Sequence, residues 1–257
     1  MYNILVPTDF SEFSDFALQY GTFLAKKNDS NLYILHIVRN EEKYEAAQKK
    51  LKAISKLPSL REVKAHIVLE KGNNVSKNIN KVAEELEVKL IIMGSNGVSN
   101  VEEMILGSNT ENVIIKTRFD VLTVKHEMNS QELNTILFPS NFKQEAYNVF
   151  ESVIKTAKAF NACIHLLKVG KDTPKDRERV NDFVSYFQLE EQGIDYCINI
   201  LDNSSLELGI LNYAMNNDID LIAIGTHGKG AIKKLLQEST SQNLVRDAFR
   251  PVLTMRF

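Results

Sequence analysis

The residues best placed to do chemistry in this sequence are three glycines and a serine at a fixed spacing. Gly94 and Gly97 are followed, after nine further residues, by Gly107 and Ser108. Glycine allows a sharp turn and lets the backbone approach a ligand without a Cβ in the way. The last pair opens a segment with a helical pattern, and free N–H groups at the start of a helix attract an anion. The spacing therefore predicts a phosphate site that needs no nearby lysine.

A second candidate segment, Pro7-Thr8-Asp9, comes directly after the first apolar run. The carboxylate of Asp9 could contact a ligand, or it could cap the helix that follows. The glycine segments also have a purely structural interpretation. Ser108 with Glu111 three residues later forms a capping box, and the first two glycines could simply end a strand and turn. Both interpretations stay open at the level of sequence.

These segments belong to a repeat that spans the chain. Three stretches recur in the same order and at nearly constant spacing: Ile4–Phe10 as Ile136–Phe142, Leu90–Gly97 as Leu221–Gly228, and Val121–Lys125 as Val252–Arg256. Shared order and spacing indicate a duplicated domain. We expect one domain over residues 1–128 and a second over residues 131–257, joined by the polar stretch Glu127–Gln131.

Each copy alternates short apolar runs with helical patterns. The first copy predicts strands at Asn3–Pro7, Leu32–Val38, Val63–Glu70, Lys89–Gly94 and Val121–Lys125. Helices are predicted at Ser11–Lys27, Lys43–Ser55, Val75–Leu86 and Ser108–Thr117. The second copy predicts strands at Thr135–Phe138, Cys163–Val169, Asp195–Leu201, Leu221–Gly225 and Val252–Arg256. This alternation is typical of an α/β fold with a five-stranded, parallel, doubly wound sheet and right-handed crossovers.

The order of the strands decides whether the two candidate segments meet. In a Rossmann-like order, 3-2-1-4-5, the first and fourth strands are neighbours at the point where the chain reverses direction. Ligands of open α/β sheets bind in the crevice at that point. We therefore expect Asp9 and the turn that begins at Gly94 to line one pocket.

The motifs resemble those of the universal stress protein family, once in each copy. The family's nucleotide-binding members carry a glycine, two residues, a glycine, nine residues, and then a glycine followed by Ser or Thr. The positions of Gly94, Gly97, Gly107 and Ser108 match that pattern one by one. The resemblance implies two tandem Rossmann-like domains of the adenine nucleotide alpha hydrolase-like type. It also implies binding of ATP, or of AMP or ADP, with Mg²⁺ held through the phosphates and not by protein side chains.

The resemblance assigns further residues to the ligand. Asp9 would lie close to the adenosine, and Ile37, at the end of the second strand, would pack by the base. The complete nucleotide-binding set is Pro7, Thr8, Asp9, Ile37, Met93, Gly94, Gly97, Gly107, Ser108 and Asn109. Relatives usually pair through the last strand, so the two copies would pair within the chain along Val121–Lys125 and Val252–Arg256, and a homodimer is also possible.

The second copy departs from the motif. Its corresponding site would consist of Asn141, Val169, Gly225, Gly228, Glu238 and Ser239, and Lys168 stands where the first copy has His36. Glu238 replaces the third glycine, and its charge would repel phosphates. A carboxylate is nevertheless favourable at the start of a helix. Whether Glu238 stands in for the phosphate or points to solvent is open, but either way we expect this copy to bind nucleotide weakly or not at all.

The composition excludes several classes of protein. The net charge is -2, from 31 basic and 33 acidic residues, so neither nucleic acid nor an anionic membrane is an expected partner. No apolar run approaches the roughly 18 residues of a membrane span, and the N-terminus does not read as a secretory signal. The two cysteines, Cys163 and Cys197, fit packing roles and a reducing cytoplasm. The five histidines show no metal-binding spacing.

Three functions compete. The favoured one is an ATP-responsive binding module in stress or signalling, and the alternatives are a slow Mg²⁺-dependent ATPase and a nucleotide-free scaffold. No general base, arginine finger, Walker signature or kinase signature stands out, which speaks against an efficient enzyme.

Overall fold

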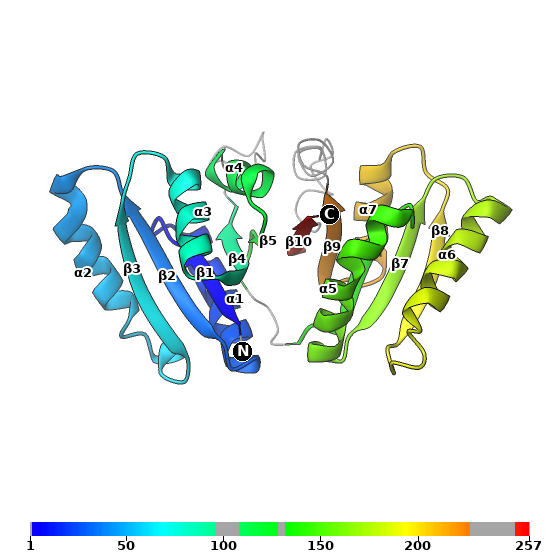
Figure 1. Cartoon of the computed structure of the whole chain (residues 1–257), viewed down its shortest axis with the longest axis horizontal. Helices are drawn as coiled ribbons and strands as arrows, with labels where there is room; N and C mark the ends of the chain where they lie inside the picture. The colour runs from blue at the N-terminus through cyan, green and yellow to red at the C-terminus, as the bar shows by residue number, and fades with distance from the viewer. Residues whose placement is uncertain (1, 96–107, 128–131, 227–249, 257) are drawn as a thin grey trace. The chain divides into compact units, whose positions relative to one another are not determined.

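The computed structural model describes residues 2–95, 108–127, 132–226 and 250–256. The chain divides into two compact units, residues 1–129 and residues 130–257, each with five of the strands (Figure 1). They are called the first and the second unit below.

The first unit alternates strands and helices along its whole length. Its strands are β1 (Asn3–Pro7), β2 (Asn31–Val38), β3 (Lys64–Lys71), β4 (Val88–Gly94) and β5 (Asp120–Val124). Its helices are α1 (Glu12–Lys27), α2 (Tyr44–Ile54), α3 (Val75–Glu85) and α4 (Ser108–Lys116), with short 3₁₀ turns η1 (Glu41–Lys43) and η2 (Pro58–Leu60).

The second unit repeats this plan. Its strands are β6 (Thr135–Pro139), β7 (Cys163–Val169), β8 (Tyr196–Leu201), β9 (Leu221–Thr226) and β10 (Val252–Arg256). Its described helices are α5 (Gln144–Phe160), α6 (Pro174–Phe187) and α7 (Leu206–Asn216). All ten predicted strands and all four predicted helices are present, with ends within one residue of the prediction.

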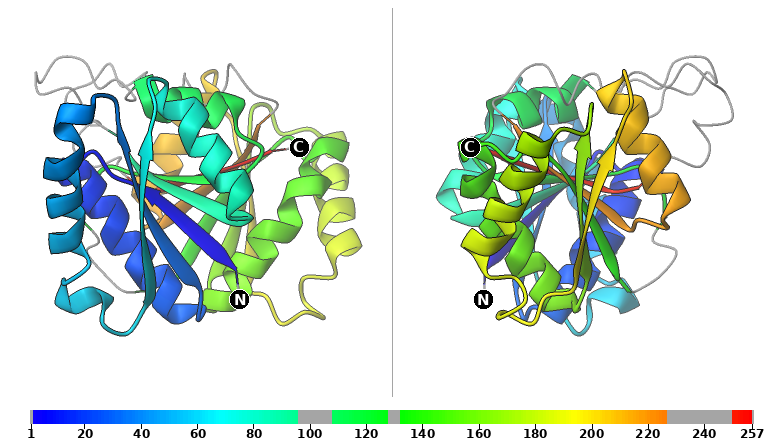
Figure 2. Two further views of the ribbon diagram at one scale, coloured as in Figure 1. Left: turned by 60° about the vertical axis from the view of Figure 1, so that its left-hand side comes forward. Right: turned by 90° about the vertical axis from the view of Figure 1, so that its right-hand side faces the viewer.

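The predicted strand order is confirmed in both units. The first sheet runs β3-β2-β1-β4-β5 and the second runs β8-β7-β6-β9-β10, with parallel pairing throughout. The strands twist across each sheet, as right-handed strand twist requires (Figure 2). The neighbouring strands β1 and β4 place the carboxyl ends predicted to form the site side by side.

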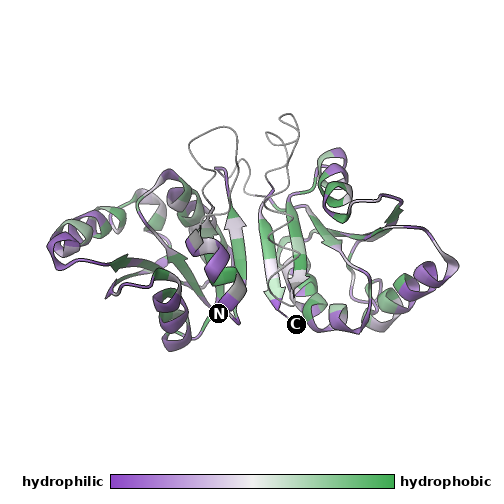
Figure 3. Cartoon of the chain, turned by 90° about the horizontal axis from the view of Figure 1, so that it is seen from above, coloured by the Kyte–Doolittle hydropathy of each residue, from purple (hydrophilic) through white to green (hydrophobic). Residues whose placement is uncertain are grey.

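Consecutive apolar residues explain why the central strands are buried. Ile4, Leu5 and Val6 of β1 are all fully buried, as are Ile91 and Ile92 of β4. A strand buried at successive positions must be covered on both faces, because neighbouring side chains point to opposite faces of the sheet. Figure 3 shows these hydrophobic strands lying between layers of helices in each unit.

Polar side chains fix where several helices begin. The hydroxyl of Ser11 accepts a hydrogen bond from the Ser14 N–H at the start of α1, and Asn74 caps α3 in the same way. In the second unit Thr173 and Ser205 cap α6 and α7. These caps satisfy backbone N–H groups that have no partner within a helix. No helix in the described part of the chain combines the length and the hydropathy that crossing a bilayer requires.

Candidate nucleotide-binding site

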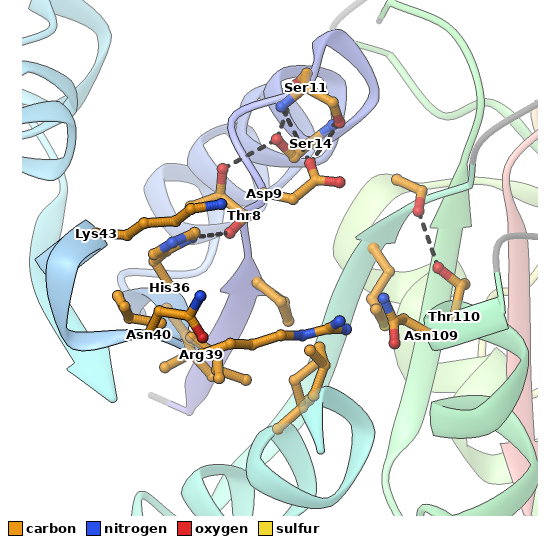
Figure 4. Close-up of a pocket in the computed structure, with 18 residues that line it drawn as sticks. Thr8, Asp9, Ser11, Ser14, His36, Arg39, Asn40, Lys43, Asn109 and Thr110 are labelled. Atoms are coloured by element: carbon orange, nitrogen blue, oxygen red, sulfur yellow. Dashed lines mark hydrogen bonds between the residues drawn. The ribbon is translucent and has the colours of Figure 1, made fainter. Parts of the chain in front are cut away.

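A pocket of about 510 Å³ opens at the carboxyl ends of β1, β2 and β4 in the first unit (Figure 4). Seven residues predicted to bind nucleotide line it: Pro7, Thr8, Asp9, Ile37, Met93, Gly94 and Asn109. Gly97 and Gly107 lie outside the described residues, and so does the side chain of Ser108, where α4 begins. The pocket lies where the strand order reverses, which is where the sequence placed it.

Thr8 holds the loop between β1 and α1 in place. Its N–H donates to the Leu35 carbonyl at 2.8 Å, and its hydroxyl lies 2.9 Å from the Ser14 hydroxyl. The same oxygen accepts from the N–H of Phe10, whose φ of 65° is in the left-handed region. Ser140 and Phe142 repeat this arrangement in the second unit. The family resemblance implied that Thr8 contacts the ligand. The structure adds that its side chain also holds the loop in shape.

Asp9 both shapes the loop and faces the pocket. Its Oδ1 accepts hydrogen bonds from the N–H and the hydroxyl of Ser11, the residue that caps α1. Asn141 makes the equivalent bond to the N–H of Lys143, so this turn is common to both copies. The Oδ2 of Asp9 has no hydrogen-bond partner among the described residues and is the atom left for a ligand. The helix-capping interpretation of Asp9 is wrong, because Ser11 is the N-cap of α1 and Asp9 holds Ser11 in place instead.

His36 is fixed in one tautomer beside the loop. Its Nδ1 lies 2.7 Å from the Thr8 carbonyl oxygen, which can only accept, so the proton sits on Nδ1. The ring of Phe10 packs on the imidazole with centroids 4.3 Å apart, and Lys50 of α2 lies 4.9 Å from the Phe10 ring centre. The stacked side chains of Lys50, Phe10 and His36 join α2 to the loop after β1, and His36 lines the pocket.

The end of β4 is tied to the start of α4. The Thr110 hydroxyl donates to the Gly94 carbonyl at 3.1 Å, and the N–H of Ser95 donates to the Val124 carbonyl at 2.9 Å. Thr110 is buried, and the sequence did not predict that it lines the pocket. Its hydrogen bond holds the first turn of α4 beside the end of the strand.

Gly94 is required by packing as well as by its place in the pocket. A Cβ placed on Gly94 would lie 2.2 Å from the carbonyl oxygen of Phe13 in the first turn of α1. The backbone of α1 therefore passes against β4 at this point, and only glycine leaves room for it.

The pocket has an apolar side and a charged side. Val75 and Ile79 of α3 line it together with Ile37. Arg39 and Lys43, on the connection from β2 to α2, bring two cations that the sequence did not predict. Their place in the pocket could not be predicted from the sequence, because the connection after β2 carries no recognisable motif.

In the second unit an ion network joins the elements that correspond to the pocket walls. The ammonium of Lys168 lies 3.2 Å from the Asp176 carboxylate, and Arg179 lies 3.1 Å from the same carboxylate. Arg179 also donates to the Asn141 carbonyl at 3.4 Å. The side chains of Lys168 and Asp176 are only 12% and 15% exposed. Helix α6 is thus tied to the ends of both β6 and β7.

The remaining predicted residues of the second copy follow the repeat where they are described. Val169 ends β7, and Gly225 lies in β9. A Cβ on Gly209 of α7 would lie 2.8 Å from Val169, so α7 packs directly on the position that corresponds to Ile37. Gly228, Glu238 and Ser239 lie outside the described residues.

We expect Asp176→Ala to lower the denaturant midpoint of the second unit, because Lys168 and Arg179 then lose their common partner. The hydrogen bond from Thr173, together with the charges of Lys168 and Arg179, lowers the pKa of Asp176. A lowered carboxyl pKa stabilises the fold above the unfolded pKa, and this contribution is lost as the pH falls through the lowered value.

Urea unfolding of wild type and variant between pH 3 and 7 measures this effect. Asp182→Ala, an exposed change on the same helix, is the control. Equal midpoints for Asp176→Ala and Asp182→Ala at pH 7 would show that the network contributes nothing to stability.

The cysteines and most of the histidines lie away from the pocket. Cys163 and Cys197 lie on the paired strands β7 and β8 and are free, and burial raises the pKa of the Cys163 thiol. A raised pKa keeps the thiol protonated and unreactive, in line with the predicted packing role. His165 lies 3.0 Å from the Tyr213 hydroxyl of α7. Within the described ranges, no three His, Cys, Asp or Glu side chains gather into a metal site.

Comparison with known proteins agrees with the repeat. The model of the universal stress protein family matches residues 1–125 and again residues 132–256. The chain is 23% identical over 290 residues to the universal stress protein Slr1230 of Synechocystis sp., with all of both chains covered. It is 30% identical over 153 residues to the universal stress protein MJ0577 of Methanocaldococcus jannaschii, covering 48% of this chain and 94% of that one.

A solved structure shows the same fold across both units. The crystal structure of a universal stress protein from Archaeoglobus fulgidus matches with a TM-score of 0.80 at 22% identity, covering 99% of this chain and 98% of that one. The two family matches together span nearly the whole sequence. The chain therefore belongs to the universal stress protein family and carries two copies of the family's domain in one polypeptide.

Proposed function

We propose that the first unit is an ATP-binding module, with Mg²⁺ held through the phosphates, and that occupancy of this one site is the signal the protein carries. The observation that carries the proposal is the pocket at the end of β1, β2 and β4. Its volume of about 510 Å³ is within the roughly 300–1,000 Å³ of small-molecule sites.

Different parts of the pocket suit the base, the ribose and the phosphates of a nucleotide. The apolar side formed by Ile37, Val75 and Ile79 suits the adenine ring. The free Oδ2 of Asp9 suits a ribose hydroxyl. The start of α4, held by Thr110, offers backbone N–H groups and a helix dipole to the phosphates. ADP and AMP share the first two parts and are ligands of the same site.

The second unit is proposed to stay empty. Glu238 takes the place of the third motif glycine, and the network of Lys168, Asp176 and Arg179 ties the corresponding walls together. Two independent features thus oppose binding there, which supports a stoichiometry of one ATP per chain.

Calorimetric titration of the nucleotide-stripped chain with ATP and Mg²⁺ tests this proposal. We expect one ATP per chain, and binding weakened at least about a hundredfold in Gly107→Glu, which copies the second unit's sequence. The reciprocal change, Glu238→Gly, is the control and should leave the stoichiometry at one, because the ion network remains. A wild-type chain that binds no adenine nucleotide would contradict the proposal.

A further inference from the structure

Two cations on the connection from β2 to α2 face the pocket without a partner of their own. Arg39 and Lys43 both line the pocket and both are exposed. Among the described residues, neither side chain makes a hydrogen bond or an ion pair. The neighbouring acid Glu41 is already paired with Lys71 at 2.7 Å, so it does not neutralise them.

The lining of the pocket therefore carries more positive than negative charge. Asp9 is the single carboxylate among the described lining residues, and its Oδ1 is occupied by Ser11. Arg39 and Lys43 supply two positive charges against it. A concave surface with uncompensated cations concentrates anions from solution.

The second unit provides an internal comparison. There, the cations Lys168 and Arg179 beside the corresponding loop ends share the carboxylate of Asp176. Lys168 stands at the position of His36, so this pair of cations is not the counterpart of Arg39 and Lys43, and its charge is balanced by Asp176 within the protein. Arg39 and Lys43 have no such carboxylate partner among the described residues, which leaves both cations available to an anionic ligand.

The directions of the two side chains indicate which part of a ligand they meet. Figure 4 shows Arg39 extended across the pocket toward Asn109 in the first turn of α4, while Lys43 points toward Thr8. Phosphates bound at the start of α4 would have the guanidinium group facing them from the opposite wall. A guanidinium group binds phosphate oxygens in pairs and holds its charge at any ordinary pH.

We propose that Arg39 and Lys43 form a second phosphate-binding wall, which takes the terminal phosphates of the nucleotide and makes the site select ATP and ADP over AMP. This inference rests on the proposed nucleotide site and adds the basis of its selectivity. Backbone N–H groups near α4 hold the phosphate next to the ribose in every nucleotide, whereas only a longer phosphate chain reaches the two cations.

Titration of Arg39→Gln, Lys43→Gln and the double variant with ATP, ADP, AMP and adenosine tests the inference. We expect wild type to bind ATP at least about tenfold more tightly than AMP, since one charge-assisted hydrogen bond contributes about that much. The double variant should lose most of this preference and keep its affinity for adenosine. Lys49→Gln, the same charge change at an exposed site on α2 outside the pocket, should keep the wild-type preference.

The possible outcomes separate the two proposals. Equal losses for ATP, AMP and adenosine would place the cations against the nucleoside and overturn the inference. An unchanged ATP-to-AMP ratio in the double variant would overturn it as well, while leaving the nucleotide site intact. Failure of wild type to bind any of these ligands would overturn the proposed function, and the inference with it.

Discussion

Gly94→Ala is expected to destabilise the first unit by at least about 3 kcal/mol, the upper part of the range for inserting atoms into a packed interior. The new methyl group would meet the carbonyl oxygen of Phe13 at 2.2 Å, and a backbone atom cannot rotate away as a side chain can. Relief requires α1 to move off β4, and that movement disturbs Thr8 and Ser14, whose hydroxyls are 2.9 Å apart. Urea unfolding followed by circular dichroism measures the loss.

Gly193→Ala is the matched control for this prediction. Gly193 has a φ of 66°, and nothing lies within 4 Å of the position its Cβ would take. The change should therefore cost only about 1 kcal/mol, from the left-handed backbone alone. If the two alanine variants unfold at the same urea concentration, the close contact with Phe13 is not a constraint on this fold.

This prediction also changes how Gly94 is understood. The sequence left open whether Gly94 lets the backbone approach a ligand or only ends a strand and turns, and the structure adds a helix that needs the same space. Loss of ATP binding in Gly94→Ala would thus be an effect of folding and not evidence of a ligand contact. Substitutions in the loop walls are cleaner probes of the site.

The strands could be predicted from sequence because their signal is local. Runs such as Ile4 to Val6 are apolar at successive positions, which is typical of a strand covered on both faces. Because the repeat shows the same order of strands and helices in both copies, it supported one strand order for each unit. The pairing of β1 with β4 agrees with that order. The strand order predicted that Asp9 and Gly94 line one pocket, and seven of the ten residues that the family resemblance assigned to the nucleotide do line it.

The residues that escaped prediction depend on contacts between distant segments. Arg39 and Lys43 belong to no motif in the sequence, and only the fold places them in the lining of the pocket. Thr110 acts through the Gly94 carbonyl, which no spacing rule indicates. Asp176 could have been suspected only by noticing that Lys168, a cation at the end of a buried strand, needs a partner.

The internal repeat also explains why Asp9 was ambiguous. Asn141 makes the same bond to the following turn as Asp9 does, so the turn needs only a side-chain oxygen and not a charge. The charge of Asp9 is the part of the residue that folding does not require. The second copy has lost that charge together with its third motif glycine, which is the expected pattern if both serve the ligand.

Ile37→Asp is expected to weaken ATP binding at least about a hundredfold, equivalent to about 2.7 kcal/mol. Ile37 lies on the apolar side of the pocket with Val75 and Ile79, where the adenine ring is proposed to pack. The substitution removes apolar contact area and introduces a carboxylate into a site meant for an anionic ligand. Calorimetric titration with ATP measures the effect.

Ile67→Asp is the control, because it makes the same chemical change on the adjacent strand β3 in the same unit. Ile67 is 38% exposed and does not line the pocket, so its substitution should leave ATP affinity within about threefold of wild type. Both variants should keep the far-ultraviolet circular dichroism of wild type, since Ile37 is itself only half-buried. Similar ATP affinities for the two variants would mean that the base does not pack on Ile37, and the orientation of the nucleotide in the pocket would have to be reversed.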